Sequence, residues 1–97
     1  MITYVSLVTW TEQGIKHVKD TVKRSEAAAQ LAEQMGGRLT TVLWTQGPYD
    51  LVIIGEYPDE ASAQASILAL GSVGNVKTLT LRAFSAAEMT NILEKLS

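Results

Sequence analysis

The residues best suited to chemistry are one arginine and a tyrosine–aspartate pair, set among aromatic side chains. Arg82 stands next to an alanine and Phe84, and Tyr49-Asp50 follows directly on a Gly-Pro turn. A guanidinium among aromatic rings suits a carboxylate, a phosphate or a stacked planar ring. The alternative for Arg82 is an ion pair at the end of a strand. These residues favour a site for a small organic or anionic ligand over a reaction centre.

Asp50 has two interpretations. As a structural residue it would cap the turn by accepting hydrogen bonds from nearby backbone amides. As a functional residue it would form a polar pair with Tyr49 at the mouth of a pocket and act as an acid or base. Glu56 lies at the far end of the same predicted strand, about 20 Å away at the rise of a strand. No carboxylate pair is therefore expected within one subunit, and the structural role is favoured.

Metal and phosphate chemistry find little support. His17 is the only histidine, and a metal or catalytic role would require Glu12 or Asp20 beside it. The loop 71–75 contains two glycines but lacks the phosphate-loop pattern and precedes a strand. The chain has no cysteine, which excludes disulfides, iron–sulfur clusters and thiol nucleophiles. We predict neither a metal nor a cofactor.

Composition limits the class of protein and of partner. The chain has 97 residues, a net charge of −2, 46% hydrophobic residues and 19% charged residues, as in an ordinary globular domain. The acidic balance argues against nucleic acid or an anionic membrane as a partner, because both require a basic surface. No apolar run approaches the ~20 residues of a membrane span, and the first residues lack the basic region of a secretory signal. We predict a single domain, residues 1–97, in the cytoplasm.

Hydrophobic periodicity predicts the element order β-α-β-β-α-β followed by a last helix. The first helix has a possible break at Asp20-Thr21, and the short link 46–48 indicates an antiparallel hairpin. We expect strands at 2–10, 38–45, 49–57 and 76–84, helices at 15–35 and 59–70 with Gly71 ending the second, and a final helix opened by a Ser85–Glu88 capping box. This order predicts an α+β, ferredoxin-like fold with a four-stranded antiparallel sheet.

Alternation along the strands divides the sheet residues between two faces, of which the helices can cover only one. We assign to the helices the more aliphatic face, which consists of Val5, Leu7, Val52, Ile54, Leu79 and Leu81. The face left open would hold Tyr4, Val8, Trp10, Val42, Trp44, Leu51, Ile53, Arg82 and Phe84. Such an apolar area is unusual on a soluble monomer. It predicts a homodimer in which two sheets face each other as a barrel.

The chain also resembles a known family, the GYD domain family of small bacterial and archaeal proteins. The residues that carry the resemblance are Gly47, Tyr49, Asp50, Glu56, Pro58 and Asp59, supported by the segments 11–14, 71–76 and 82–84. The resemblance covers nearly the whole chain and implies the dimeric α/β-barrel superfamily, but no defined activity. The Gly-x-Tyr-Asp hairpin is also similar to a segment of the effector-binding domains of leucine-responsive regulators, which bind amino acids between subunits.

Three functions remain open at this point. The first is an oligomeric module that binds or senses a small molecule in a pocket between facing sheets, with Tyr4, Trp10, Trp44, Tyr49, Asp50 and Arg82 as the predicted ligand-binding residues. The second is a cofactor-free enzyme of the dimeric-barrel type, similar to a monooxygenase or a dehydratase. The third is a purely structural oligomer. The shortage of acid–base groups favours binding over catalysis, but whether the chain is an enzyme stays open.

Overall fold

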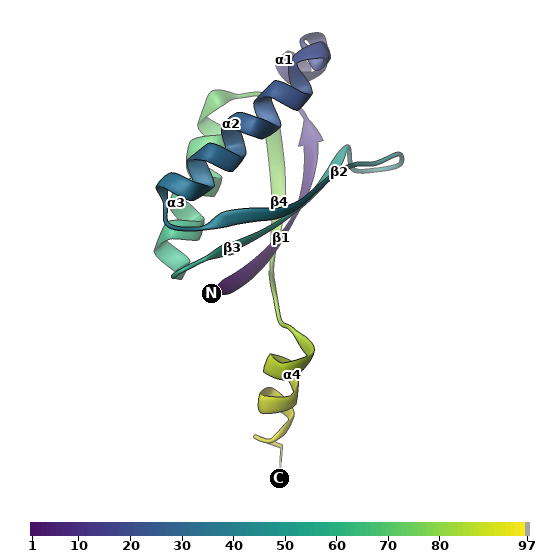
Figure 1. The fold of residues 1–97 in the computed structure, drawn as a ribbon. Helices are drawn as coiled ribbons and strands as arrows, with labels where there is room; N and C mark the ends of the chain where they lie inside the picture. Colours follow the sequence, from purple (N-terminus) through teal and green to yellow (C-terminus); the bar gives the residue numbers. More distant parts are fainter. Residues whose placement is uncertain (97) are drawn as a thin grey trace.

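The computed structural model describes residues 1–96, which form one antiparallel sheet with helices on one side of it (Figure 1). The strands are β1 (Ile2–Trp10), β2 (Arg38–Trp44), β3 (Leu51–Tyr57) and β4 (Val76–Ala83), in the spatial order β2-β3-β1-β4. The helices are α1 (Glu12–Lys16), the 3-10 helix η1 (Val18–Asp20), α2 (Thr21–Gln34), α3 (Glu60–Val73) and α4 (Ala86–Leu93). The predicted ferredoxin-like fold with a C-terminal helix is confirmed.

Local chemistry explains where the first helical segments begin. Thr11 caps α1, since its Oγ1 accepts a hydrogen bond from the Gly14 N–H at 3.1 Å. The predicted break at Asp20-Thr21 is confirmed, because η1 ends at Asp20 and α2 starts at Thr21. After α2 the chain turns through Gly36, whose positive φ of 81° favours glycine.

Three predicted boundaries are wrong. The first helical region begins at Glu12 rather than at residue 15. Helix α3 does not end at Gly71 but continues to Val73, because Gly74 takes the left-handed conformation (φ 91°) that terminates it. Strand β3 begins at Leu51 rather than at residue 49, so Tyr49 and Asp50 belong to the hairpin loop. The hairpin itself is antiparallel, as predicted.

The predicted choice of face is also wrong, because the helices cover the opposite one. Val8 is only 1% exposed and forms the main core with Leu51 and Ile53 beneath the helices. A second cluster joins Tyr57 to Ala32 of α2 and Ala63 of α3, with Tyr4 packed against it. We call this side the covered face, defined by Tyr4, Ser6, Val8, Trp10, Val42, Trp44, Leu51, Ile53, Tyr57, Thr78, Thr80 and Arg82.

The physical reason is size complementarity. The helices present small residues, including Ala28, Ala32, Ala63 and Ser66, towards the sheet. Small helix residues leave room for large aromatic side chains on the facing strands, and a protein interior must fill that room. The aliphatic side therefore remains open. We call it the open face, defined by Val5, Leu7, Leu43, Val52, Ile54, Leu79 and Leu81.

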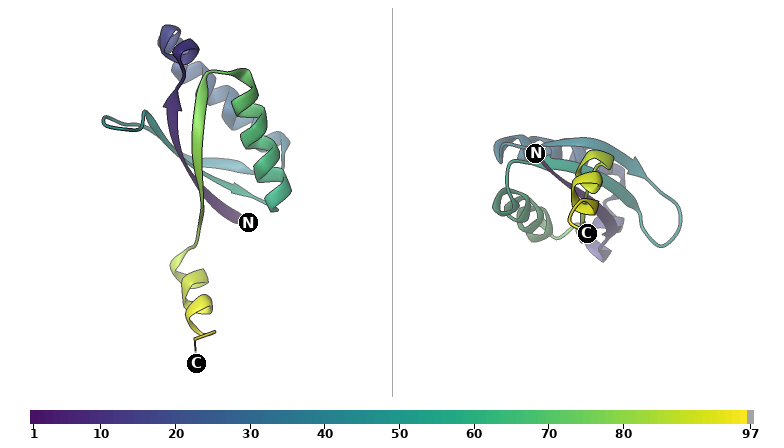
Figure 2. Two further views of the ribbon diagram at one scale, coloured as in Figure 1. Left: turned by 180° about the vertical axis from the view of Figure 1, so that it is seen from behind. Right: turned by 90° about the horizontal axis from the view of Figure 1, so that it is seen from below.

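Helix α4 stands apart from the rest. It leaves the end of β4 and extends away from the sheet, which helps to give the chain extents of 52 × 30 × 18 Å (Figure 2). Its predicted capping box is confirmed: the Ser85 Oγ accepts from the Glu88 N–H at 3.1 Å, and Glu88 Oε1 accepts from the Ser85 N–H at 2.9 Å. Within residues 1–96, no helix combines the length and the hydrophobicity that crossing a bilayer demands.

Candidate functional site

The six predicted ligand-binding residues fall into two groups at opposite ends of the sheet. Tyr4 lies opposite Arg82 in the register of β1 and β4, near one end. Trp10 lies six residues further along β1, about 20 Å away at the rise of a strand. Asp50 is bonded to the Trp10 end. The structure therefore does not bring the six residues into one pocket, and the two groups are described separately.

At the first end, Arg82 is engaged by its own chain. Its Nη2 lies 3.4 Å from Glu88 Oε2 in an ion pair, and its Nη1 donates to the carbonyl oxygens of Thr3 and Ala83. The guanidinium carbon lies 4.4 Å from the centroid of the Phe84 ring and 6.0 Å from that of Tyr4. This geometry corresponds to the ion pair at a strand end. A ligand role for Arg82 and Tyr4 stays a prediction.

The ion-pair partner of Arg82 has a second hydrogen bond that fixes its charge. The Ser85 backbone N–H, and to a smaller extent Arg82, hold the pKa of Glu88 below its usual value. Through these bonds Glu88 links the start of α4 to the end of β4.

At the other end, Asp50 joins two parts of the sheet. Its Oδ2 accepts a hydrogen bond from the Trp10 backbone N–H at 2.9 Å, and its own N–H donates to the Val8 carbonyl at 2.8 Å. Its carbonyl accepts from the Thr45 N–H, while the Tyr49 carbonyl accepts from the Thr45 hydroxyl. These bonds attach the hairpin loop to the end of β1. An acid–base role for Asp50 stays a prediction.

The two tryptophans lie near the start of α2. Trp44 Nε1 donates to Thr21 Oγ1 at 3.0 Å. Trp10 Nε1 is buried and finds no hydrogen-bond partner among residues 1–96, and its side chain lines a small pocket of about 40 Å³ together with Thr21 and Arg24. Both indoles therefore pack beneath or beside the helix layer and not on the open face.

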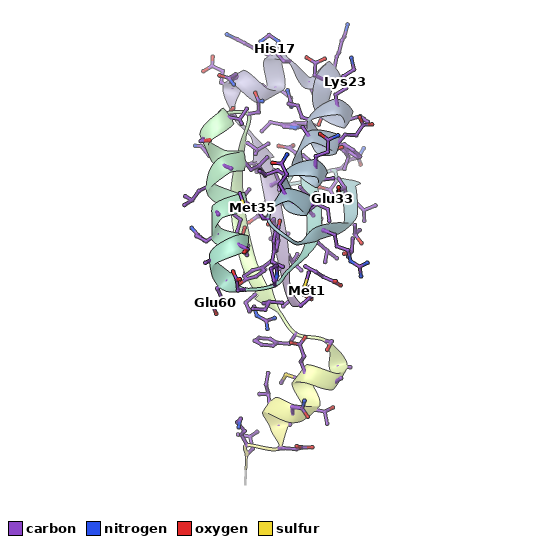
Figure 3. All side chains as sticks on the ribbon, turned by 60° about the vertical axis from the view of Figure 1, so that its left-hand side comes forward. Met1, His17, Lys23, Glu33, Met35 and Glu60 are labelled. Atoms are coloured by element: carbon purple, nitrogen blue, oxygen red, sulfur yellow. The ribbon has the colours of Figure 1, made fainter. Side chains whose placement is uncertain are left out.

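His17 is linked to the tryptophan group only through its backbone, since its carbonyl accepts a hydrogen bond from Arg24 Nη1 at 2.9 Å. It is exposed in the turn between α1 and η1, at the opposite end of the helix layer from Glu60 (Figure 3). Among the residues that the structure describes, no three histidine, aspartate or glutamate side chains come together in a way that could hold a metal ion.

One cavity was missed by the sequence reasoning. It has a volume of about 560 Å³ and opens between α3 and strands β1 and β4; its lining residues are Tyr4, Glu60, Ala61, Ala63, Gln64, Ile67, Thr78 and Thr80. Only Tyr4 was among the predicted site residues. The alternating threonines of β4 are the one signal in the sequence, and the tertiary approach of α3 that completes the cavity leaves no local pattern.

The open face is the other candidate, as an interaction surface. Leu43, Leu79 and Leu81 are each about half exposed, and the remaining members are branched aliphatic residues of similar size. Charges lie at its borders, with Lys77 near one end and the Arg38–Glu56 ion pair, 3.2 Å between Nη2 and Oε2, near the other. An apolar centre within a polar rim is the usual anatomy of a protein–protein interface.

Comparison with known proteins decides the family. The GYD domain model matches residues 4–93, which is most of the chain. The chain belongs to the GYD domain family. In this GYD domain, two residues of the name have a visible structural part: Gly47 has a positive φ of 113°, and the Asp50 carboxylate bonds the Trp10 N–H of β1.

Two comparisons, one of sequence and one of structure, find similarity to proteins of Thermus thermophilus. The sequence relative is named glutamine synthetase and cystathionine beta-lyase binding protein; it is 34% identical over 90 residues, which are 92% of this chain and 95% of the relative. The other comparison is with a crystal structure, with a TM-score of 0.58 and 25% identity over 89% of this chain and 96% of that chain. Both likenesses extend over nearly the full length of either protein.

Proposed function

We propose that this GYD domain is a self-associating protein-binding module, in which two copies meet through their open faces and the resulting dimer binds an enzyme. The observation that carries the proposal is the open face itself. Its seven aliphatic side chains lie together on the uncovered side of the sheet, and three leucines among them are about half exposed. A surface of this kind on a monomer marks an interaction site.

A second copy would meet a mainly aliphatic surface, to which Thr41, opposite Ile54 on the edge strand β2, adds one hydroxyl. Burying a leucine fully is worth roughly 1.5–3 kcal/mol, so covering half-exposed leucines contributes about half as much each. The side chains that define the face carry no hydrogen-bonding group that the contact would leave unpaired. The same patch on both copies can meet itself about a twofold axis, and stacked sheets pack about 10 Å apart.

The proposed client is an enzyme of amino-acid metabolism in the cytoplasm. The support is the Thermus relative, whose name describes a protein that binds glutamine synthetase and cystathionine beta-lyase. The centre of the open face offers no acid or base, since its members are Val, Leu and Ile. A binding role therefore fits the chemistry of this face better than catalysis does.

The test compares two leucines on opposite sides of the molecule. Leu79 is 50% exposed on the open face, and Leu68 is 63% exposed on α3. Sedimentation velocity should show wild-type and Leu68→Glu chains as dimers and Leu79→Glu as a monomer, because a carboxylate cannot be buried against a second aliphatic sheet. A wild-type monomer, or a Leu79→Glu dimer as tight as wild type, would contradict the proposed interface.

The client is tested separately, with purified glutamine synthetase and cystathionine β-lyase from the same organism. We expect the immobilised wild-type domain to retain at least one of them, and an unrelated dimer of the same net charge to retain neither. If the domain dimerises but binds neither enzyme, the client assignment fails and the self-association stands.

A second candidate function rests on the cavity between α3 and β4. Its volume of about 560 Å³ is within the range of small-molecule sites, and its lining combines a tyrosine ring with threonine hydroxyls, a glutamine and a glutamate. These groups suit a small polar organic ligand. This position differs from the pocket between facing sheets that alternation predicts.

Native mass spectrometry tests that candidate. A bound ligand would appear as one additional mass per chain that mild denaturation releases, and Ile67→Trp should abolish it by filling the cavity. If neither the wild type nor the variant carries a releasable mass, the ligand-binding candidate is rejected and only the protein-binding role remains.

A further inference from the structure

Helix α4 differs from the other α-helices because it does not pack against the sheet. It follows β4 after a short link and points away from the sheet in Figure 1 and in the left view of Figure 2. Its ion pair to the body is Arg82–Glu88, at 3.4 Å, next to its capping box. None of the strands or helices within residues 1–83 packs along its length. The helix therefore has a fixed start and no support beyond its first turn.

One side of α4 is nevertheless apolar. Met89, Ile92, Leu93 and, just past the helix, Leu96 recur at spacings of three, four and seven residues, and all four are exposed. This spacing places them on one stripe of a helix. A helix of eight residues is marginal in water on its own and gains its stability from packing such a stripe. The α4 stripe, defined by these four residues, therefore requires a cover.

We propose that α4 is an exchanged arm, which lays its stripe on the second copy of the chain in the homodimer proposed above. The inference rests on that proposed dimer and deepens it. Each copy would give one arm and receive one, so that the exchange closes with twofold symmetry and leaves no stripe unpaired. The occupant of the stripe is thus the same protein and not a client enzyme.

The first argument for a second copy is continuity. Strand β4 places Leu79 and Leu81 on the open face and then leads, through Ala83, directly into α4. The α4 stripe begins within two turns of a strand that already lies at the proposed interface. A partner that covers the open face along β4 is therefore the nearest body that the arm can reach.

The second argument is area. Four strands about 4.8 Å apart and roughly seven residues long at about 3.3 Å each span a sheet of roughly 20 × 23 Å, or ~450 Å² before side-chain relief. A standard interface buries about 800 Å² on each partner. The open face alone is small by this measure, and the arm supplies additional apolar surface of the same aliphatic kind.

Hydrogen exchange at two protein concentrations tests the proposal directly. Above the dimer dissociation constant, the backbone amides of residues 89–93 should exchange much more slowly than below it, because only the partner protects them. Amides of β1, at the centre of the sheet, serve as the internal reference and should remain protected at both concentrations. Fast exchange of α4 at every concentration, or equal protection in the monomer, would overturn the exchanged arm.

Matched variants separate this inference from the proposed function. In sedimentation experiments, Ile92→Gln with Leu93→Gln should raise the dimer dissociation constant about tenfold or more, while Asn91→Gln on the opposite side of α4 should not change it. If the double variant dimerises like wild type while Leu79→Glu is monomeric, the arm fails and the open-face dimer stands. If Leu79→Glu still dimerises and the double variant does not, the arm stands and the open face fails. Protection of α4 that appears only with a client enzyme would overturn the exchange in favour of that enzyme.

Discussion

The two faces of the sheet differ in the size and chemistry of their side chains. The covered face mixes large rings with small and hydroxyl-bearing residues, and its aromatic side chains pack against small helix residues, as Tyr57 does against Ala32 and Ala63. The open face repeats branched aliphatic residues of nearly one size. A unique fold needs specific fit on one side. A surface that meets a second copy of itself, as proposed for the open face, needs a self-complementary shape and few polar groups left unpaired.

Polar groups sharpen the contrast. On the covered face, the hydroxyls of Ser6 and Thr80 bond each other at 2.9 Å, and Trp44 Nε1 bonds Thr21. Each such pair depends on one particular arrangement of the strands and helices. The members of the open face have no such partners to find. The chain's own helices cover one face, and the second copy proposed above would cover the other.

The largest expected effect comes from placing the same charge on either face. Val8→Asp introduces a carboxylate at a position that is 1% exposed, whereas Leu79→Asp places it where the side chain is half exposed. We expect Val8→Asp to lose more than about 4 kcal/mol of unfolding free energy and to leave little folded protein. Leu79→Asp should change the stability of the monomer by less than about 1 kcal/mol.

Urea denaturation at a concentration below the dimer dissociation constant measures both values, with the wild type as reference. The comparison of faces would be contradicted by a Leu79→Asp monomer that is destabilised as strongly as Val8→Asp. Conversely, a folded and stable Val8→Asp would mean that the helices do not close over this side of the sheet.

The sequence predicts the elements and their pairing well, because these follow from local signals. Alternation along β1 and β4 correctly separates Val5 and Leu7 from Tyr4 and Val8, and the break before Thr21 and the Ser85 capping box are visible in residue types. Alternation is symmetric, however, and says which residues share a face but not which face the helices cover. The prediction assigned the helices to the more aliphatic face. In the structure they cover the other face, whose large side chains fit the small residues of the helices.

The residues that decide which face is covered lie in the helices and not in the strands. Alanines at 28, 32 and 63 approach the sheet, and their small volume is what accommodates the rings of Tyr4 and Tyr57. The six predicted site residues do not share one pocket within the chain for a related reason. Aromatic and polar residues that share a face can still lie about 20 Å apart along it, and spacing in the sequence does not bring Arg82 to Trp10.

A smaller effect is expected at the end of the covered face, where Asp50 fastens the hairpin loop to β1. Asp50→Ala removes the acceptor of the Trp10 N–H, a part-buried bond of 2.9 Å. We expect a loss of about 1–3 kcal/mol of unfolding free energy, measured by urea denaturation, because the Trp10 amide then lacks its partner. Asp20→Ala is the control, since the Asp20 side chain makes no capping hydrogen bond, and it should change stability by less than about 0.5 kcal/mol. Equal losses in the two variants would show that Asp50 does not act as a clamp.

The smallest effect concerns the helix that closes the covered face. The Ser62 backbone N–H, which donates to Asp59 Oδ1 at 2.7 Å at the start of α3, lowers the pKa of Asp59 below 3.8. A depressed folded-state pKa gives stability that is present above the unfolded pKa and is lost as pH falls through the folded one. The stability difference between wild type and Asp59→Asn should therefore be constant above about pH 5 and should shift against the wild type below about pH 4. Thermal unfolding from about pH 7 to about pH 2.5 measures it, and repeating the series in about 1 M salt checks the cause. If the helix-cap hydrogen bond is the cause, the pH dependence of the stability difference should persist in high salt. If distant surface charges were the cause, it would disappear.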